Sequence, residues 1–162
     1  MGGVIVSDSG PLNYLILTDC THALEKLFQR VLIPVAVRDE LLHVGTPKAV
    51  KDWFSASRNG LEIHHVEKPH GISGIHRSES ETLQLALQLR VETVLMDDMD
   101  GRSAARKLGI KTVGTIGIIE RAAEKGEIDL AVTIAKLKST NFFVSDDLLE
   151  TVLKRHKKLK EG

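Results

Sequence analysis

With 162 residues, 42% of them hydrophobic, the chain is long enough to bury a core and lies near the usual size of a single domain. Lysine plus arginine and aspartate plus glutamate number 22 each, which excludes a global positive field as the basis of nucleic-acid binding. The single cysteine, Cys20, excludes an intramolecular disulfide and favours a reducing compartment.

Five short apolar runs recur along the chain and predict strands. The first, at 4–6, ends in the turn-forming residues 7–11, a combination that is typical of a buried strand followed by a turn. The predicted strands are 4–6, 31–33, 61–66, 93–96 and 111–113.

Helical spacing of apolar residues separates these runs. Ser78 and Glu81 have the spacing of a capping box and are expected to open a helix that continues to about Leu89. Because strands and helices alternate, we expect an α/β fold with a mostly parallel sheet covered on both faces. The chain is interpreted as one domain, 1–162, with a helical extension from about residue 127. The predicted helices are 12–16, 23–28, 35–42, 78–89, 101–108, 116–125, 130–139 and 146–160.

Membrane attachment and secretion have no support in the sequence. The amino-terminal region lacks a basic segment followed by a long apolar one. No apolar run approaches the ~18 residues needed to cross a bilayer. We therefore expect a cytoplasmic protein that does not contact membranes.

Acidic residues follow two of the predicted strands. Asp8 comes directly after the first strand, and Asp97 and Asp98 come after the fourth. Ligands of open parallel sheets bind at the carboxyl ends of the strands. Two carboxylates 4 Å apart repel by ~4 kcal/mol at an effective dielectric of 20, so a cation is needed to gather several of them. Oxygen-only ligands favour Mg²⁺ or Mn²⁺, which support phosphodiester hydrolysis.

Some of these acids also have a purely structural explanation. Asp8 precedes Pro11 and could organise an Asx-turn. Glu40 could be a solvated helix residue, and for it the ligand role and the structural role are equally supported by spacing.

The acids near the other two helix starts have similar alternatives. Glu81 could be the capping-box partner of Ser78, and Glu79 could be favoured by the helix dipole. Asp98 and Asp100 could cap the following helix. Three aspartates within 97–100 exceed what one cap requires, so a functional role is favoured there.

Taken together, these segments resemble PIN-domain proteins in order and spacing, in particular a prokaryotic subgroup described as VapC-like. The resemblance covers nearly the whole chain and implies a three-layer α/β fold. It is carried by SDSGPL at 7–12, VLIP at 31–34 with Val37 and Glu40-Leu41, ESE at 79–81, LMDD at 95–98, GTIG at 114–117 and NFFVSD at 141–146.

The resemblance implies a Mg²⁺- or Mn²⁺-dependent endoribonuclease, the toxin of a toxin–antitoxin pair, with an RNA substrate, a protein antitoxin and a homodimeric state. It also implies a substrate or water contact for the Ser9 hydroxyl. The acids that it places at the catalytic and metal site are Asp8, Glu40, Glu79 and Asp98, with Asp97 and Glu81 as alternates.

Two positions depart from the family pattern. Gly10 stands where many members have a second hydroxyl, which puts one contact to water or phosphate in doubt but not the metal site. Ser78 stands where a glycine commonly precedes the third acid, so the choice between Glu79 and Glu81 stays open.

The sequence gives less support to other functions. A receiver-like phosphoryl-accepting domain would need an acid pair after the first strand and a lysine after the last, and neither is present. A non-catalytic binding module of the same fold would make every acid structural. The histidines at 64, 65, 70 and 76 match no compact zinc pattern. The basic stretch 154–160 fits a solvated helix end better than an RNA contact.

Overall fold

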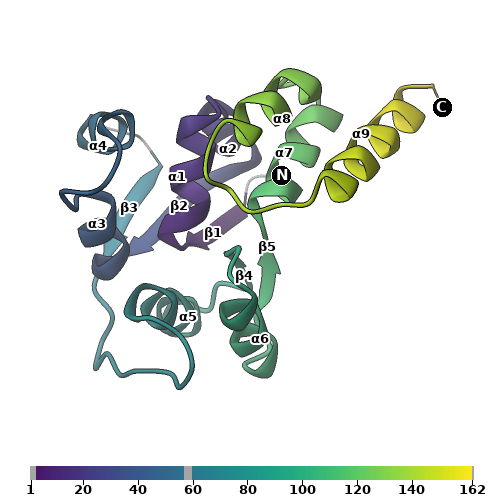
Figure 1. Ribbon diagram of the computed structural model, residues 1–162. Helices are drawn as coiled ribbons and strands as arrows, with labels where there is room; N and C mark the ends of the chain where they lie inside the picture. Colours follow the sequence, from purple (N-terminus) through teal and green to yellow (C-terminus); the bar gives the residue numbers. More distant parts are fainter. Residues whose placement is uncertain (1–2, 57–59, 162) are drawn as a thin grey trace.

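The structure is a computed structural model that describes residues 3–56 and 60–161. Its centre is a parallel sheet with the strand order β3-β2-β1-β4-β5. The predicted α/β class with a parallel sheet is confirmed (Figure 1). The strands are β1 (Gly3–Ser7), β2 (Phe28–Pro34), β3 (Leu61–His64), β4 (Thr93–Leu95) and β5 (Lys111–Val113).

Helices cover both faces of the sheet, with α1, α2 and α7 on one side and α5 and α6 on the other (Figure 1). The helices are α1 (Ser9–Leu17), α2 (Thr21–Leu27), α3 (Val35–Leu41), α4 (Lys48–Ser55), α5 (Arg77–Leu89), α6 (Met99–Lys107), α7 (Thr115–Glu124), α8 (Leu130–Lys138) and α9 (Asp146–Glu161).

The sheet separates two hydrophobic clusters. Successive strand residues point to opposite faces, so Ile5 packs in the cluster beneath α1, α2 and α7 while Val6 packs against α5 and α6. Leu32 likewise faces α5, whereas its neighbour Ile33 faces the other cluster. Burial on both faces explains why these strands are continuous apolar runs without polar alternation.

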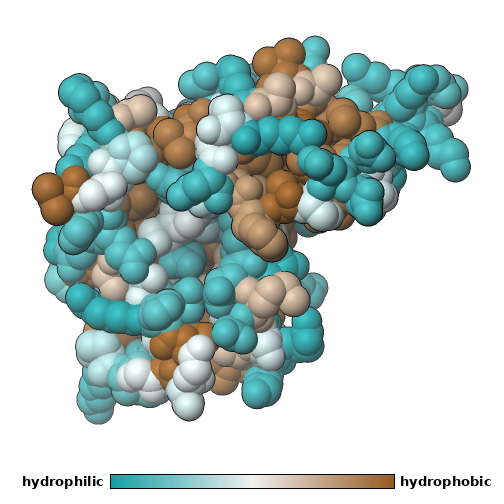
Figure 2. Space-filling model, in the orientation of Figure 1, coloured by the Kyte–Doolittle hydropathy of each residue, from teal (hydrophilic) through white to brown (hydrophobic). Residues whose placement is uncertain are grey.

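The carboxyl-terminal helices join the first of these clusters. Leu130, Leu137 and Val152 are buried in it, and α8 and α9 pack against α7. Phe143, in the connection between α8 and α9, is fully exposed. Figure 2, in the orientation of Figure 1, shows a mainly hydrophilic surface, with hydrophobic residues gathered in the region of α8 and α9. No helix within the described ranges is long and apolar enough to cross a bilayer.

The structure differs from the predicted elements in several places. The helix expected at 23–28 ends at Leu27, because Phe28 is extended and already pairs with Gly3 of β1. The strand expected at 61–66 ends at His64, where its partner strand β2 also ends at Pro34. Helix α4 was not predicted; Val50 is its one fully buried residue, so its apolar pattern is short.

Candidate active site

Asp8 lies at the carboxyl end of the central strand. Its backbone N–H donates to the Leu95 carbonyl of β4 at 2.9 Å, which holds the start of α1 against the end of the neighbouring strand. The Asp8 side chain is 6% exposed, and its Oδ1 is buried without a hydrogen-bond partner. It occupies the N-cap position of α1, yet no side-chain hydrogen bond caps the helix. The Asx-turn explanation therefore has no support at this residue.

The surroundings of Asp8 disfavour its charged form. Burial is the main cause that raises the pKa of Asp8 from 3.8 to about 7; the Ser9 N–H opposes the shift. The negative charges of Glu79 and Glu40 raise the pKa of Asp8 further, and the Ser78 hydroxyl lowers it. The central acid is thus surrounded by other acids and carries an unsatisfied oxygen.

Glu79 lies in the first turn of α5. It is 7% exposed, and its Oε2 accepts a 3.1 Å hydrogen bond from the N–H of His76, the N-cap residue. Burial raises the pKa of Glu79 and the His76 N–H opposes this. The charge of Asp98 raises the same pKa, the charge on His76 lowers it, and that of Glu40 raises it.

The predicted capping box on Ser78 and Glu81 was wrong. The N-cap lies two residues earlier than predicted, at His76, which is extended at φ −78° and ψ 167° and has Glu79 as its partner three residues on. Glu81 instead pairs with Arg77, with 2.8 Å between Oε2 and Nε. The capping spacing is preserved but shifted, so capping is no reason to rank Glu79 above Glu81. The difference between them is electrostatic, since Glu79 faces other acids and Glu81 faces a cation.

Glu40 enters the site from α3. It is exposed, and its Oε2 accepts a hydrogen bond from the Ser9 hydroxyl at the start of α1. Helix α3 follows β2 directly and carries Glu40 to the site, where its charge raises the pKa of both Asp8 and Glu79. Ser9 thus connects α1 to α3.

The two aspartates after β4 have different surroundings. Asp98 is exposed and caps α6, because its Oδ2 accepts from the Gly101 N–H at 2.8 Å. Asp97 is half-buried and holds the start of α7: its Oδ1 accepts from the Thr115 N–H at 2.7 Å and its Oδ2 from the Thr115 hydroxyl at 2.6 Å. Helix α6 accordingly begins at Met99, two residues before the predicted start.

Burial raises the pKa of Asp97, while the hydrogen bonds from Thr115 and the charge of Arg102 lower it. A Cβ added at Gly114 would lie 2.9 Å from both Asp97 Oδ1 and Arg102 Nη1. An alanine at position 114 would therefore force the Asp97 carboxylate or the Arg102 guanidinium to shift. Both Asp97 oxygens are already used, which makes it a helix anchor in the structure.

The charges of Glu40 and Glu79 raise the pKa of Asp8, and the charges of Asp98 and Glu40 raise that of Glu79, so the four predicted acids form a chain of neighbouring charges. The structure does not assemble them as a finished metal site. Across residues 3–56 and 60–161, no group of three or more His, Cys, Asp or Glu side chains is placed so that it could hold a metal ion. Glu40, Glu79 and Asp98 each accept a hydrogen bond within the protein, and these bonds help to direct their carboxylates away from a common point.

Two polar residues at the site were missed by sequence reasoning. Ser78, assigned to the cap, instead faces Asp8, and it is 4% exposed. Thr115, fully buried, holds Asp97. For Thr115 the sequence held a signal, a hydroxyl directly after Gly114 at a helix start. For Ser78 it held none.

The comparison with known protein families matches nearly the whole chain. Residues 4–158 match the model of a family described as a PIN domain. That range contains every acid described above. No curated protein matches the chain.

Proposed function

Because the chain belongs to the PIN-domain family, whose members are generally nucleases, we propose that it is a metal-dependent endoribonuclease that hydrolyses RNA phosphodiester bonds. The observation that carries the proposal is the buried Asp8 carboxyl, with an unpartnered Oδ1 and with Glu40 and Glu79 raising its pKa. A buried carboxylate next to other carboxylates destabilises the folded protein unless a cation neutralises the cluster, so such a cluster indicates a cation site.

The donor chemistry at this edge fits a hard divalent cation. Every donor is a carboxylate or hydroxyl oxygen, which suits Mg²⁺ or Mn²⁺ better than zinc. The residues that would hold the ion are Asp8, Glu40, Glu79 and Asp98. A bound ion of this kind would activate water and stabilise the leaving oxygen.

The residues of the chain have separate tasks in this proposal. With a pKa of about 7, Asp8 carries a proton in part of the molecules near pH 7, and it would have to lose that proton to hold a cation, since carboxylate ligands must be ionised. The Ser9 hydroxyl donates to Glu40, and it would be free to donate to a phosphate oxygen if Glu40 bound a cation instead. The anchored Asp97 fixes α7 beside the site.

The toxin role is part of the same proposal and rests on the VapC-like resemblance. It comprises a homodimer and a protein antitoxin that silences the nuclease. Co-expression with the product of an adjacent small gene tests this role, because the partner should co-purify and suppress cleavage. An isolated gene and a monomer in solution would contradict it.

A non-catalytic module of the same fold is the alternative, and one observation favours it. Glu40, Glu79 and Asp98 each accept a hydrogen bond within the protein, and Asp8 accepts from the Ser9 N–H and the Ser78 hydroxyl, so the acids are partly stabilised without a cation. Under this alternative, Mn²⁺ would not bind at the site and RNA would remain intact.

Cleavage of a single-stranded RNA in Mg²⁺, in Mn²⁺ and in EDTA separates the two. We expect cleavage with either metal, none in EDTA, and a loss of at least ~100-fold in Asp8→Asn and in Glu79→Gln, because each variant removes a charge from a cluster on which a catalytic ion depends. Asp100→Asn is the matched control, since it neutralises an exposed acid one residue into α6. Equal activity in Asp8→Asn and Asp100→Asn would refute the proposed site.

A further inference from the structure

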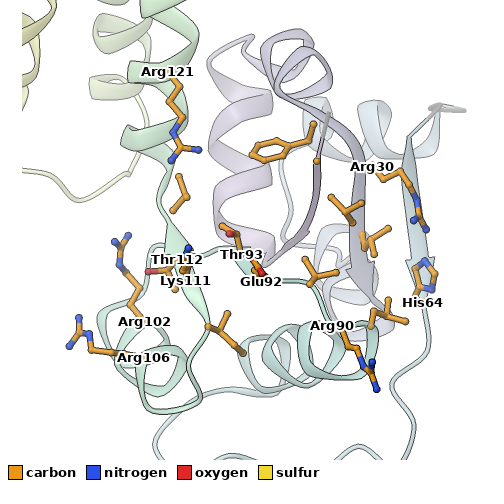
Figure 3. A pocket seen from close by; sticks show the side chains of 18 residues that line it. Arg30, His64, Arg90, Glu92, Thr93, Arg102, Arg106, Lys111, Thr112 and Arg121 are labelled. Carbon is orange, nitrogen blue, oxygen red and sulfur yellow. The ribbon is translucent and has the colours of Figure 1, made fainter. Parts of the chain in front are cut away.

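A large open cavity is lined by residues from the amino-terminal parts of β1, β2, β4 and β5 and by residues of α5, α6 and α7. Its volume is about 1030 Å³, and Gly3 of β1, Glu92 before β4 and Lys111 of β5 contribute to its wall. Figure 3 shows Arg102 and Arg106 on one side of it, Arg30 and His64 on the other, and Arg121 approaching from α7.

The wall of this cavity is strongly basic although the chain as a whole has no net charge. Glu92 is the one carboxylate among its lining residues. Arg30 is neutralised by Glu62 outside the wall, with 2.6 Å between Nε and Oε2. The other five cations form no ion pair within the part of the chain that the structure describes. The lining cations are Arg30, Arg90, Arg102, Arg106, Lys111 and Arg121.

Protection of a sheet edge explains only part of this concentration. β5 is an edge strand, and a cation such as Lys111 on an edge discourages pairing with another chain. Arg90 follows α5 and Arg121 is on α7, so neither is on that strand. The cations outnumber the acids around the cavity, and their mutual repulsion favours an anionic ligand between them.

We propose that this cavity binds the phosphate backbone of single-stranded RNA, a role that rests on the proposed ribonuclease function. Five of its six cations are arginines, whose planar guanidinium groups match phosphate oxygens. The Thr93 and Thr112 hydroxyls stand between them as further donors.

Arg102 connects the cavity to the acidic edge. It lines the cavity, its Nη1 donates to the Met96 carbonyl at 3.3 Å, and its charge lowers the pKa of Asp97. A single-stranded RNA held in the cavity would therefore pass α6 and β5 to reach the carboxyl end of β4. This continuity with the acids favours RNA over an acidic protein segment as the ligand.

The test is binding of a fluorescent single-stranded RNA in EDTA, where the proposed cleavage cannot occur. The variant is Arg106→Gln with Lys111→Gln, two exposed cations of the cavity. The control is Lys157→Gln with Lys158→Gln, which removes the same charge from the exposed part of α9, outside the cavity. Thermal unfolding verifies that each variant is folded, and Arg90→Gln replaces the double variant should that one fail to fold.

We expect the cavity variant to bind RNA on the order of tenfold more weakly at 0.1 M salt, and the slope of log affinity against log salt to fall by about 1.4, because each phosphate contact to a single strand contributes about 0.7. The α9 control should change neither quantity much. Equal losses in both variants, or no RNA binding by the wild type, would overturn the proposal. Tighter binding of oligoglutamate than of RNA, lost in the cavity variant, would overturn it in favour of an acidic protein partner.

The two proposals can fail separately. RNA binding that depends on the cavity, together with no cleavage in Mg²⁺ or Mn²⁺, would refute the nuclease function and leave the RNA path in place. Cleavage that depends on Asp8, with RNA binding and cleavage rate both unchanged when Arg106 and Lys111 are replaced, would refute only RNA binding in the cavity.

Discussion

Asp8→Asn should make the protein more stable at pH 8 in the absence of metal. Burial, together with the charges of Glu79 and Glu40, raises the pKa of Asp8 from 3.8 to about 7. At 1.36 kcal/mol for each pH unit, the ionised carboxylate costs the folded state roughly 4 kcal/mol above pH 7. An amide avoids that cost, but it stays buried with an unmet hydrogen bond worth about 1–3 kcal/mol. The net gain is about 1–3 kcal/mol.

The pH dependence of the effect follows from the direction of the shift. Folded Asp8 keeps its proton up to about pH 7, whereas the unfolded chain loses it near pH 3.8, so the folded state binds more protons between these values. Wild-type stability therefore falls as pH rises through this window. Between pH 5 and pH 8 the Asp8 contribution falls by roughly 3 kcal/mol, and the asparagine variant lacks this contribution.

The assay is urea unfolding of both proteins in EDTA at pH 5 and pH 8, followed by thermal unfolding at pH 8 in excess Mn²⁺. The stability difference between variant and wild type should move by roughly 3 kcal/mol in favour of the variant from pH 5 to pH 8. Excess Mn²⁺ should raise the wild-type midpoint through linkage and raise the variant's much less. A variant that is less stable than wild type at pH 8 would show that the ionised Asp8 does not destabilise the folded state. Equal stabilisation of both proteins by Mn²⁺ would show that Asp8 is not a ligand.

Three further changes probe the surroundings. Glu79→Gln should weaken Mn²⁺ affinity more than Glu81→Gln, because Glu79 faces other acids and Glu81 faces Arg77; the reverse order in a Mn²⁺ titration would exchange their roles. Thr115→Val should destabilise the protein by about 1–3 kcal/mol in urea unfolding, since Asp97 loses a donor for a half-buried carboxylate, and an unchanged midpoint would show that the contact is dispensable. Leu83→Ala should cost about 2–5 kcal/mol, because the side chain is fully buried between α5 and the sheet, and a cost below 1 kcal/mol would contradict its place in that core.

Local residue pattern was sufficient to predict the architecture. The apolar runs at 4–6, 31–33 and 93–96 had to become central strands, because an extended segment without polar alternation needs cover on both faces. A parallel sheet then places Asp8 and Asp98 at the same edge, whatever the loops do. Which acids are ligands remains a prediction.

Helix starts depended on contacts across the fold. Ser78 looks like a cap in isolation, but the loop before α5 is held by that helix: Ser80 Oγ accepts from the Ile72 N–H at 3.1 Å, and Gln84 Oε1 accepts from the His70 N–H, also at 3.1 Å. These bonds place the loop where His76 becomes the N-cap. Residues eight and fourteen positions apart set the boundary, so a four-residue window could not predict it.

The electrostatic features were decided entirely by tertiary structure. The sequence supplies the acids in order, but the raised pKa of Asp8 arises from burial and from charges contributed by α3 and α5. The basic cavity was equally hidden, because its cations are scattered from Arg30 to Arg121 in a chain with no net charge. The sequence by itself determined which segments form strands, since a run of apolar residues is local in the chain and its burial is favourable wherever it packs. Only the tertiary structure decided which charges meet, since electrostatic interaction depends on distance through space.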